Sequence, residues 1–94
     1  MQFEEFSKSI DAAAPPASLN KYAAALWYDA KGDWEKAHTL VQDENSGTAA
    51  WIHAYLHRKE GDQGNAAYWY RLANRRMPTV SLEEEWKIIT EAVL

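Results

Sequence analysis

The stretch TAAWIHAYLHRKEGDQGNAAYWYRLANRRMP, residues 48–78, decides the fold of this chain. Its first half is rich in helix-forming residues up to Gly61, and glycine ends helices readily because it adopts left-handed backbone angles without a Cβ clash. Asp62 follows as a candidate N-cap of a second helix, and Pro78 cannot continue that helix. Two helices joined by so short a turn run antiparallel and pack on each other. The stretch therefore predicts a helical hairpin over residues 48–77.

The second helix of this hairpin has an inward face and a basic end. Ala66, Tyr70 and Ala73 recur at four- and three-residue spacing, so they share the face that meets the first helix. Arg75 and Arg76 fall in the expected last turn, where the helix dipole favours positive charge. With Arg71 they form a basic edge, which we expect to pair with the glutamate-rich final helix rather than to bind phosphate.

Composition points to one small packed domain spanning residues 1–94. The chain is 47% hydrophobic and carries five tryptophans and five tyrosines, which argues for a core rather than disorder. It has no cysteine, so disulfides, thiolate catalysis and cysteine-based zinc sites are excluded. The net charge of −4 disfavours nucleic acid as a partner.

Membrane insertion and export are not expected from this sequence. No apolar run approaches the roughly 20 residues that span a bilayer. The first residues, MQFEEFSKSI, are acidic and lack the basic and apolar regions of a signal peptide. We therefore expect a cytoplasmic protein that does not bind membranes.

The rest of the chain also shows helical periodicity. Apolar residues at three- and four-residue spacing predict an N-terminal helix over 3–10, and two prolines then break the helical pattern. Residues 19–42 predict a first hairpin, with Ser18 as its N-cap. Residues 81–93 predict a final helix that caps the array, and its three glutamates are interpreted as solvated charges at the helix start.

The two hairpins look like copies of one unit. The dipeptide Gly-Asp occurs at residues 32–33 and again at 61–62, and alanine follows at the same offset in GDWEKA and GDQGNA. Matching helix-turn-helix units at this separation are typical of α-solenoids.

The central unit resembles a tetratricopeptide repeat or its Sel1-like relative, and the string AAYWYRLA resembles the second helix of Sel1-type repeats. The chain is similar to short stand-alone bacterial proteins of this kind. The resemblance implies an all-α fold: a short right-handed α-solenoid of two hairpins, with an N-terminal helix and a C-terminal capping helix. The residues that carry it are Gly61, Asp62, Ala66, Tyr70, Ala73 and Pro78, with Tyr28, Gly32, Asp33 and Ala37 in the first unit.

Repeats of this class mostly bind a peptide or protein in the groove lined by their first helices. The resemblance therefore implies a small protein-interaction module without catalytic activity, whose partner is a protein, a peptide or a second copy of the chain. Equally, the terminal helices can fold over this surface and bury its aromatic rings as core. The groove residues carried over are Tyr22, Leu26, Asp29, Trp51, Tyr55, Arg58 and Lys59.

Histidines are the other candidate site. His53 and His57 are four residues apart, a spacing that can chelate a metal, but a third ligand is not evident and His38 belongs to another helix. We interpret the pair as hydrogen-bonded histidines in a helix interface, and expect no metal and no cofactor. The alternative function is a small-ligand-binding protein or an enzyme with a polar pocket of His53, His57 and Tyr68.

Overall fold

Six α-helices and no strands make up the computed structural model, which describes residues 1–94. The all-helical prediction is thereby confirmed. None of the helices combines the length and the apolar character that crossing a bilayer requires. The helices are α1 (Phe3–Ser9), α2 (Lys21–Ala30), α3 (Trp34–Gln42), α4 (Gly47–Glu60), α5 (Gln63–Leu72) and α6 (Leu82–Val93).

The two Gly-Asp turns form as predicted. Gly32 and Gly61 adopt left-handed backbone angles, with φ of 87° and 90°. Asp33 then caps α3 by accepting from the Lys36 amide, and Asp62 caps α5 by accepting from the Asn65 amide. Each turn thus ends one helix and starts the next within two or three residues, which forces an antiparallel pair.

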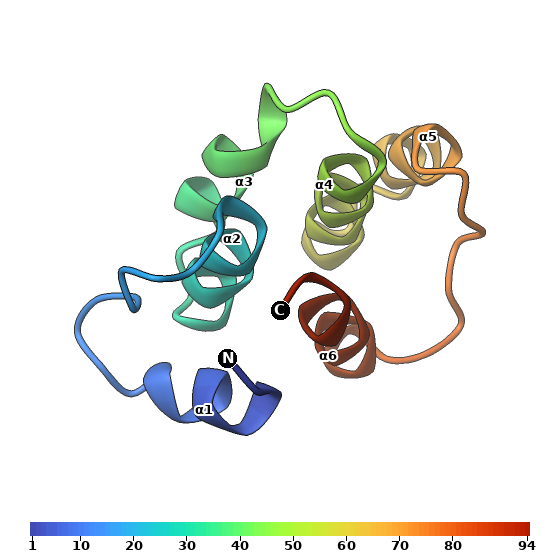
Figure 1. Cartoon of the computed structure of the whole chain (residues 1–94). Coiled ribbons are helices and arrows are strands. Elements are labelled where there is room, and N and C mark those ends of the chain that lie inside the picture. The colour runs from blue at the N-terminus through green and yellow to red at the C-terminus, as the bar shows by residue number, and fades with distance from the viewer.

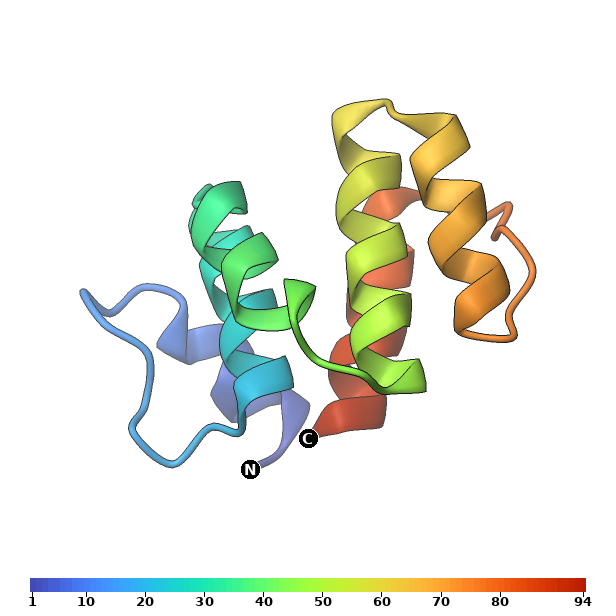
Figure 2. The same cartoon turned by 90° about the horizontal axis from the view of Figure 1, so that it is seen from above.

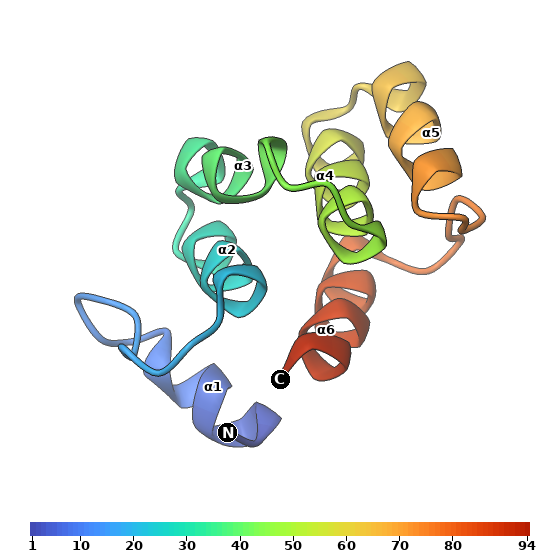
Figure 3. The ribbon, with the colours of Figure 1, turned by 45° about the horizontal axis from the view of Figure 1, so that its top comes forward.

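The hairpins α2–α3 and α4–α5 lie side by side, and α3 packs against α4 where they meet (Figure 1). α6 runs across the inner face of this pair and contacts both α2 and α4. Seen from above, α6 lies behind α4 while α5 stays on the outside of the molecule (Figure 2). The C-terminal end of α6 comes close to the N-terminus and α1 (Figure 3).

The core lies between these helices, and aromatic contacts attach α1 to it. Phe6 is fully buried, and the Phe3 and Phe6 rings lie 5.8 and 5.9 Å from the Trp86 ring of α6. The buried apolar core consists of Phe6, Ala23, Ala25, Leu26, Trp27, Ala37, Val41, Ala49, Trp51, Ile52, Ala54, Tyr55, Leu56, Ala66, Tyr70 and Ile89.

α5 ends at Leu72, five residues earlier than the sequence predicted. Asn74 adopts a left-handed φ of 58°, and its amide donates to the Arg71 carbonyl while the Arg75 amide donates to the Tyr70 carbonyl. This pair of bonds is a Schellman motif, and asparagine is one of the few residues other than glycine that serves there. The arginines 75 and 76 therefore lie in the connection to α6, and the prediction that Pro78 ends the helix is wrong.

Asn20, rather than Ser18, caps α2. Its side-chain oxygen accepts from the Ala23 amide at 2.9 Å, and its side-chain nitrogen donates to the Val93 carbonyl at 2.9 Å. One residue thus starts α2 and attaches it to the end of α6. Ser81 caps α6, since its hydroxyl accepts from the Glu84 amide at 3.0 Å.

Overpacking at Ala66 tests the hairpin contact. Ala66 is fully buried, so Ala66→Leu should lower the free energy of unfolding by about 1–3 kcal/mol. Gly64 lies on the same helix with open space around it, so Gly64→Ala should leave stability unchanged or raise it by up to about 1 kcal/mol. Urea unfolding of both variants checks the contact, and equal stability of Ala66→Leu and the parent chain would contradict it.

Candidate functional site

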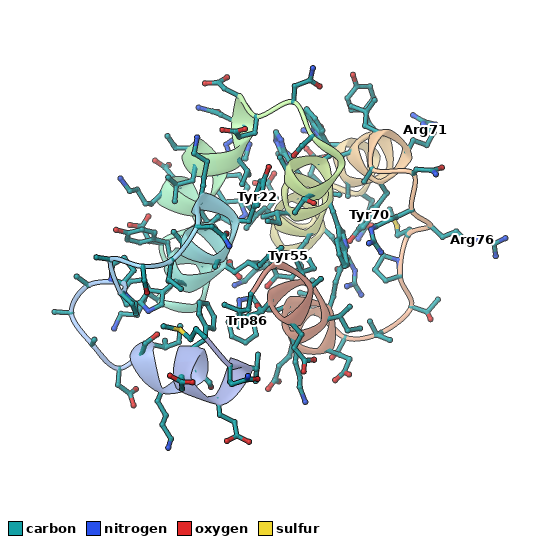
Figure 4. The ribbon with its side chains drawn as sticks, in the orientation of Figure 1. Tyr22, Tyr55, Tyr70, Arg71, Arg76 and Trp86 are labelled. Carbon is teal, nitrogen blue, oxygen red and sulfur yellow. The ribbon has the colours of Figure 1, made fainter.

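α6 fills the predicted groove, so the sequence-predicted groove residues are largely interior. Trp51 is only 7% exposed and Tyr55 only 2%. Leu26 and Asp29 are buried on α2 facing them. In the side-chain view, Tyr55 and Trp86 point into the space between α2, α4 and α6 (Figure 4). Of the two alternatives left open by the sequence, the structure shows Trp51 and Tyr55 as core.

A buried carboxylate of α6, Glu85, holds this arrangement together. Its Oε2 accepts from the Tyr70 hydroxyl at 2.6 Å and from the Trp51 indole nitrogen at 3.3 Å. Its Oε1 forms an ion pair with the Arg58 guanidinium at 2.8 Å. Arg58 also donates to the Val80 carbonyl, just before α6 begins. The predicted groove residues Trp51 and Arg58 therefore bind Glu85 of the same chain and not an external partner.

A second buried carboxylate, Asp29 of α2, is satisfied in the same way. The Tyr55 hydroxyl donates to Oδ2 at 2.8 Å, and the Lys59 ammonium donates to Oδ1 at 2.8 Å. Tyr22, the remaining groove residue, is half-buried and shares a 2.9 Å hydrogen bond with the Ser46 hydroxyl. All of these polar groups therefore have partners within the chain.

Both buried phenols are held in their neutral form. Burial raises the pKa of Tyr55, and the charge of Asp29 adds to the effect. Burial also raises the pKa of Tyr70, and its hydrogen bond to Glu85 raises that pKa further. Because neutral phenols donate and carboxylates accept, both tyrosines act as hydrogen-bond donors that anchor helices rather than as acid-base groups.

What remains of the groove is a surface hollow of about 330 Å³ near the start of α6. Its polar walls are the mutually bonded Asp29, Tyr55 and Lys59, and α6 contributes Leu82, Glu83 and Trp86. Since both Asp29 oxygens already have donors, the hollow offers a ligand few free hydrogen-bonding groups. We therefore interpret it as a by-product of helix packing.

The histidines form a cluster that the sequence did not predict. The Nε2 atoms of His38 on α3 and His53 on α4 are 2.8 Å apart. The centroid of the His57 ring lies 4.8 Å from that of His53 and 5.3 Å from that of His38. The packing of α3 against α4 thus supplies the third imidazole, because residues distant in sequence share that interface.

Aromatic rings enclose the cluster on two sides. Trp69 of α5 stacks on His53 with 3.9 Å between ring centroids, and Trp34 stacks on His38 at 4.8 Å. Tyr68, the predicted third member of the polar pocket, is instead 49% exposed, and its ring contacts Trp69 rather than a histidine. The expected pocket of His53, His57 and Tyr68 therefore does not assemble, and Trp69 takes the place given to the tyrosine.

Burial keeps two of these imidazoles neutral. It lowers the pKa of His53 to about 4, and the charges of His38 and His57 act in the same direction. Burial also lowers the pKa of His38. The Nδ1 of His53 is buried without a hydrogen-bond partner, whereas Nδ1 of His57 lies 2.5 Å from a Glu60 carboxylate oxygen. The cluster thus combines two uncharged rings, one unsatisfied nitrogen and one adjacent carboxylate.

A third feature is a cleft of about 530 Å³ between the end of α5, the connection to α6 and α6 itself. The Arg75 guanidinium lies 3.3 Å from the Trp51 ring centroid and forms one wall. Arg76, Val80 and Ile88 line the cleft as well. In the side-chain view Arg71 and Arg76 extend outward at this side of the molecule (Figure 4).

The predicted pairing of these arginines with α6 is wrong. The four ion pairs of the chain are Lys21–Glu44, His57–Glu60, Arg58–Glu85 and Lys59–Asp29, and none of them uses Arg71, Arg75 or Arg76. The early end of α5 explains the difference, because it places two of the arginines in the connection rather than on a helix face.

Comparisons of the chain with known protein families, with curated proteins and with solved structures found no match. The resemblance to tetratricopeptide and Sel1-like repeats therefore stays a prediction. A proposed function has to rest on the geometry described above.

Two tyrosines on α5 give a matched test of the buried carboxylate. Tyr70→Phe removes a donor to buried Glu85 and should lower the free energy of unfolding by about 1.5–3 kcal/mol, the range for hydrogen bonds to charged groups. Tyr68→Phe alters an exposed hydroxyl and should change it by less than about 0.5 kcal/mol. Chemical denaturation of both variants is the measurement, and losses of similar size would refute the anchoring role of Glu85.

Proposed function

We propose that this chain is a small protein-interaction module built from two tetratricopeptide-like hairpins, and that its partner binds at the outer edge formed by α5 and α6. The observation that carries the proposal is where the exposed apolar side chains lie. Five of the six large hydrophobic residues exposed on the chain fall between residues 68 and 88. We call this surface the α5–α6 edge; it comprises Tyr68, Leu72, Met77, Val80 and Ile88, with Arg71, Arg75 and Arg76 among them.

Helix packing supports a docking role for this edge. α5 packs mainly on α4, and Tyr68 and Leu72 are four residues apart on its outer side, 49% and 54% exposed. In a longer helical-repeat array, the following hairpin covers the corresponding surface. A partner helix or peptide would bury these two side chains in the same way.

Charge defines the chemistry of the partner. Three arginines without an ion-pair partner border the apolar residues. Guanidinium groups bind carboxylates in bidentate geometry and are enriched at interface hot spots. The partner that fits is therefore an acidic peptide segment or helix that also carries large apolar side chains.

Selection from a random peptide library displayed on phage tests this function directly. Selected peptides should combine Asp or Glu with Leu, Phe or Trp. The double variant Arg71→Glu/Arg76→Glu should weaken their binding by at least about tenfold, because one interface charge reversal alone can cost more than 1 kcal/mol. Fluorescence polarisation with a selected peptide at two salt concentrations measures the loss and its electrostatic origin.

The matched control is Lys8→Glu/Lys36→Glu, which makes the same charge change on exposed positions of α1 and α3. It should leave peptide binding nearly unchanged. Equal loss in both double variants, or selected peptides without acidic residues, would contradict the proposal. Sedimentation of the parent chain and of Arg71→Glu/Arg76→Glu measures whether the chain dimerises. A dimer that the double variant abolishes would identify a second copy of the chain as the occupant instead of a peptide.

A further inference from the structure

Three imidazoles meet at the α3–α4 interface, beside Trp69 of α5. One ring nitrogen from each of His38, His53 and His57 lies within 4.8 Å of the other two. From this convergence we propose that the three histidines form a binding site for a divalent transition-metal ion, with Zn²⁺ as the ion that suits it best. The inference is independent of the proposed interaction function.

The spacing of the nitrogens is close to what a tetrahedral ion needs. Zinc–nitrogen bonds of 2.0–2.1 Å place two tetrahedral ligand atoms roughly 3.3 Å apart. The Nε2 atoms of His38 and His53 are 2.8 Å apart, and no pair of candidate ligand atoms in the triad exceeds 4.8 Å. Small rotations about side-chain torsions therefore bring all three nitrogens to one ion.

Hydrogen bonding within the cluster leaves ligand capacity unused. His38 and His53 bond only through their facing Nε2 atoms, so one of them donates and the other accepts. Nδ1 of His53 has no partner although the residue is only 5% exposed. Buried polar nitrogens are nearly always paired, and an exception calls for a reason. A phenylalanine would supply the same stacking without this cost, so the imidazole is kept for its other nitrogen, the Nε2 that faces His38 and can bind an ion.

Glu60 supplies the outer partner that metal-binding histidines usually have. Its Oε1 lies 2.5 Å from Nδ1 of His57, which fixes that nitrogen as the one carrying the proton. Nε2 of His57 then keeps its lone pair for an ion. A carboxylate behind a ligand histidine also makes the imidazole a stronger donor to the metal.

The surrounding tryptophans hold the rings in place. Trp69 and Trp34 stack on His53 and His38, and the Trp34 indole nitrogen donates to the Leu56 carbonyl at 2.8 Å. Locked ligand rotamers favour metal binding because little ordering remains to be done. His38 is half-buried while the other two histidines are buried, so an ion enters past His38 and water completes its coordination there.

The ligand set selects the class of ion. Three imidazole nitrogens suit Zn²⁺, Cu²⁺, Ni²⁺ and Co²⁺, whereas Mg²⁺ and Ca²⁺ require oxygen ligands. The chain has no cysteine and no histidine outside this cluster, so the competing group His57, Glu60 and Asp62 has to share His57, and only the triad uses His38. Zn²⁺ imposes no electronic preference on geometry and therefore tolerates this triad best.

Calorimetric titration of the tag-free, chelator-treated chain with ZnCl₂ tests the site. We expect one ion per chain and a thermal midpoint that rises with Zn²⁺ concentration, because the ion binds the folded state. MgCl₂ should bind no more than weakly. His38→Phe keeps a ring on Trp34 but removes a ligand, and should weaken Zn²⁺ binding by at least about 100-fold, the upper range for loss of an outer-shell partner alone.

Glu60→Gln tests the outer partner, and Glu35→Gln is its matched control. Glu60→Gln should weaken binding by about tenfold or more through His57. Glu35→Gln removes an exposed carboxylate from α3 and should not change it. Equal Zn²⁺ affinity in the parent and His38→Phe chains, or a thermal midpoint lowered by Zn²⁺, would overturn the proposal.

Imidazole nitrogen resonances of the parent chain decide the matter if His38→Phe does not fold. One Zn²⁺ equivalent should shift a nitrogen of all three histidines together. Shifts in none of them, or in only one, would overturn the proposal without any variant.

Discussion

The carboxylate of Glu85 is the group on which the architecture depends. Glu85 is 2% exposed and lies between α6 and the two hairpins. Its carboxylate accepts hydrogen bonds from the Arg58 guanidinium, the Tyr70 hydroxyl and the Trp51 indole. A buried carboxylate is tolerated only when its charge is paired and its lone pairs have donors, and here both conditions are met. The donors come from α4 and α5, so one side chain of α6 ties three helices together.

Filling the groove moves the available surface elsewhere. The Trp86 indole nitrogen of α6 donates to the Leu26 carbonyl at 3.0 Å. α6 therefore covers the inner face of α2 as well. Most of the exposed large apolar residues then lie on α5, on α6 and in the connection between them, the α5–α6 edge. The histidine cluster lies at a third place, the α3–α4 interface, and uses neither surface. The proposed interaction surface and the proposed metal site therefore use separate parts of this fold.

The sequence predicted local structure better than it predicted which groups meet. Gly61 and Asp62 act through neighbouring backbone atoms, so their turn followed directly from residue type. The early end of α5 depends on the left-handed Asn74, a weaker helix-stop signal in the sequence than Pro78, although asparagine is suited to this position. Glu85 was interpreted as a solvated charge, yet it lies three residues after Leu82 and four before Ile89, on the apolar face of α6. His38 joined the cluster only through the packing of α3 on α4, a contact that spacing along one helix cannot reveal.

Native-state hydrogen exchange tests most directly whether α6 is an integral part of the core. The amide of Ile89 on α6 and that of Tyr55 on α4 both belong to fully or almost fully buried residues. If Glu85 locks α6 into the groove, both amides should exchange only through global unfolding, with the same opening free energy and the same denaturant dependence. An Ile89 amide that exchanges through a lower-energy local opening, while Tyr55 stays protected, would show that α6 is a detachable cover and that the groove can open.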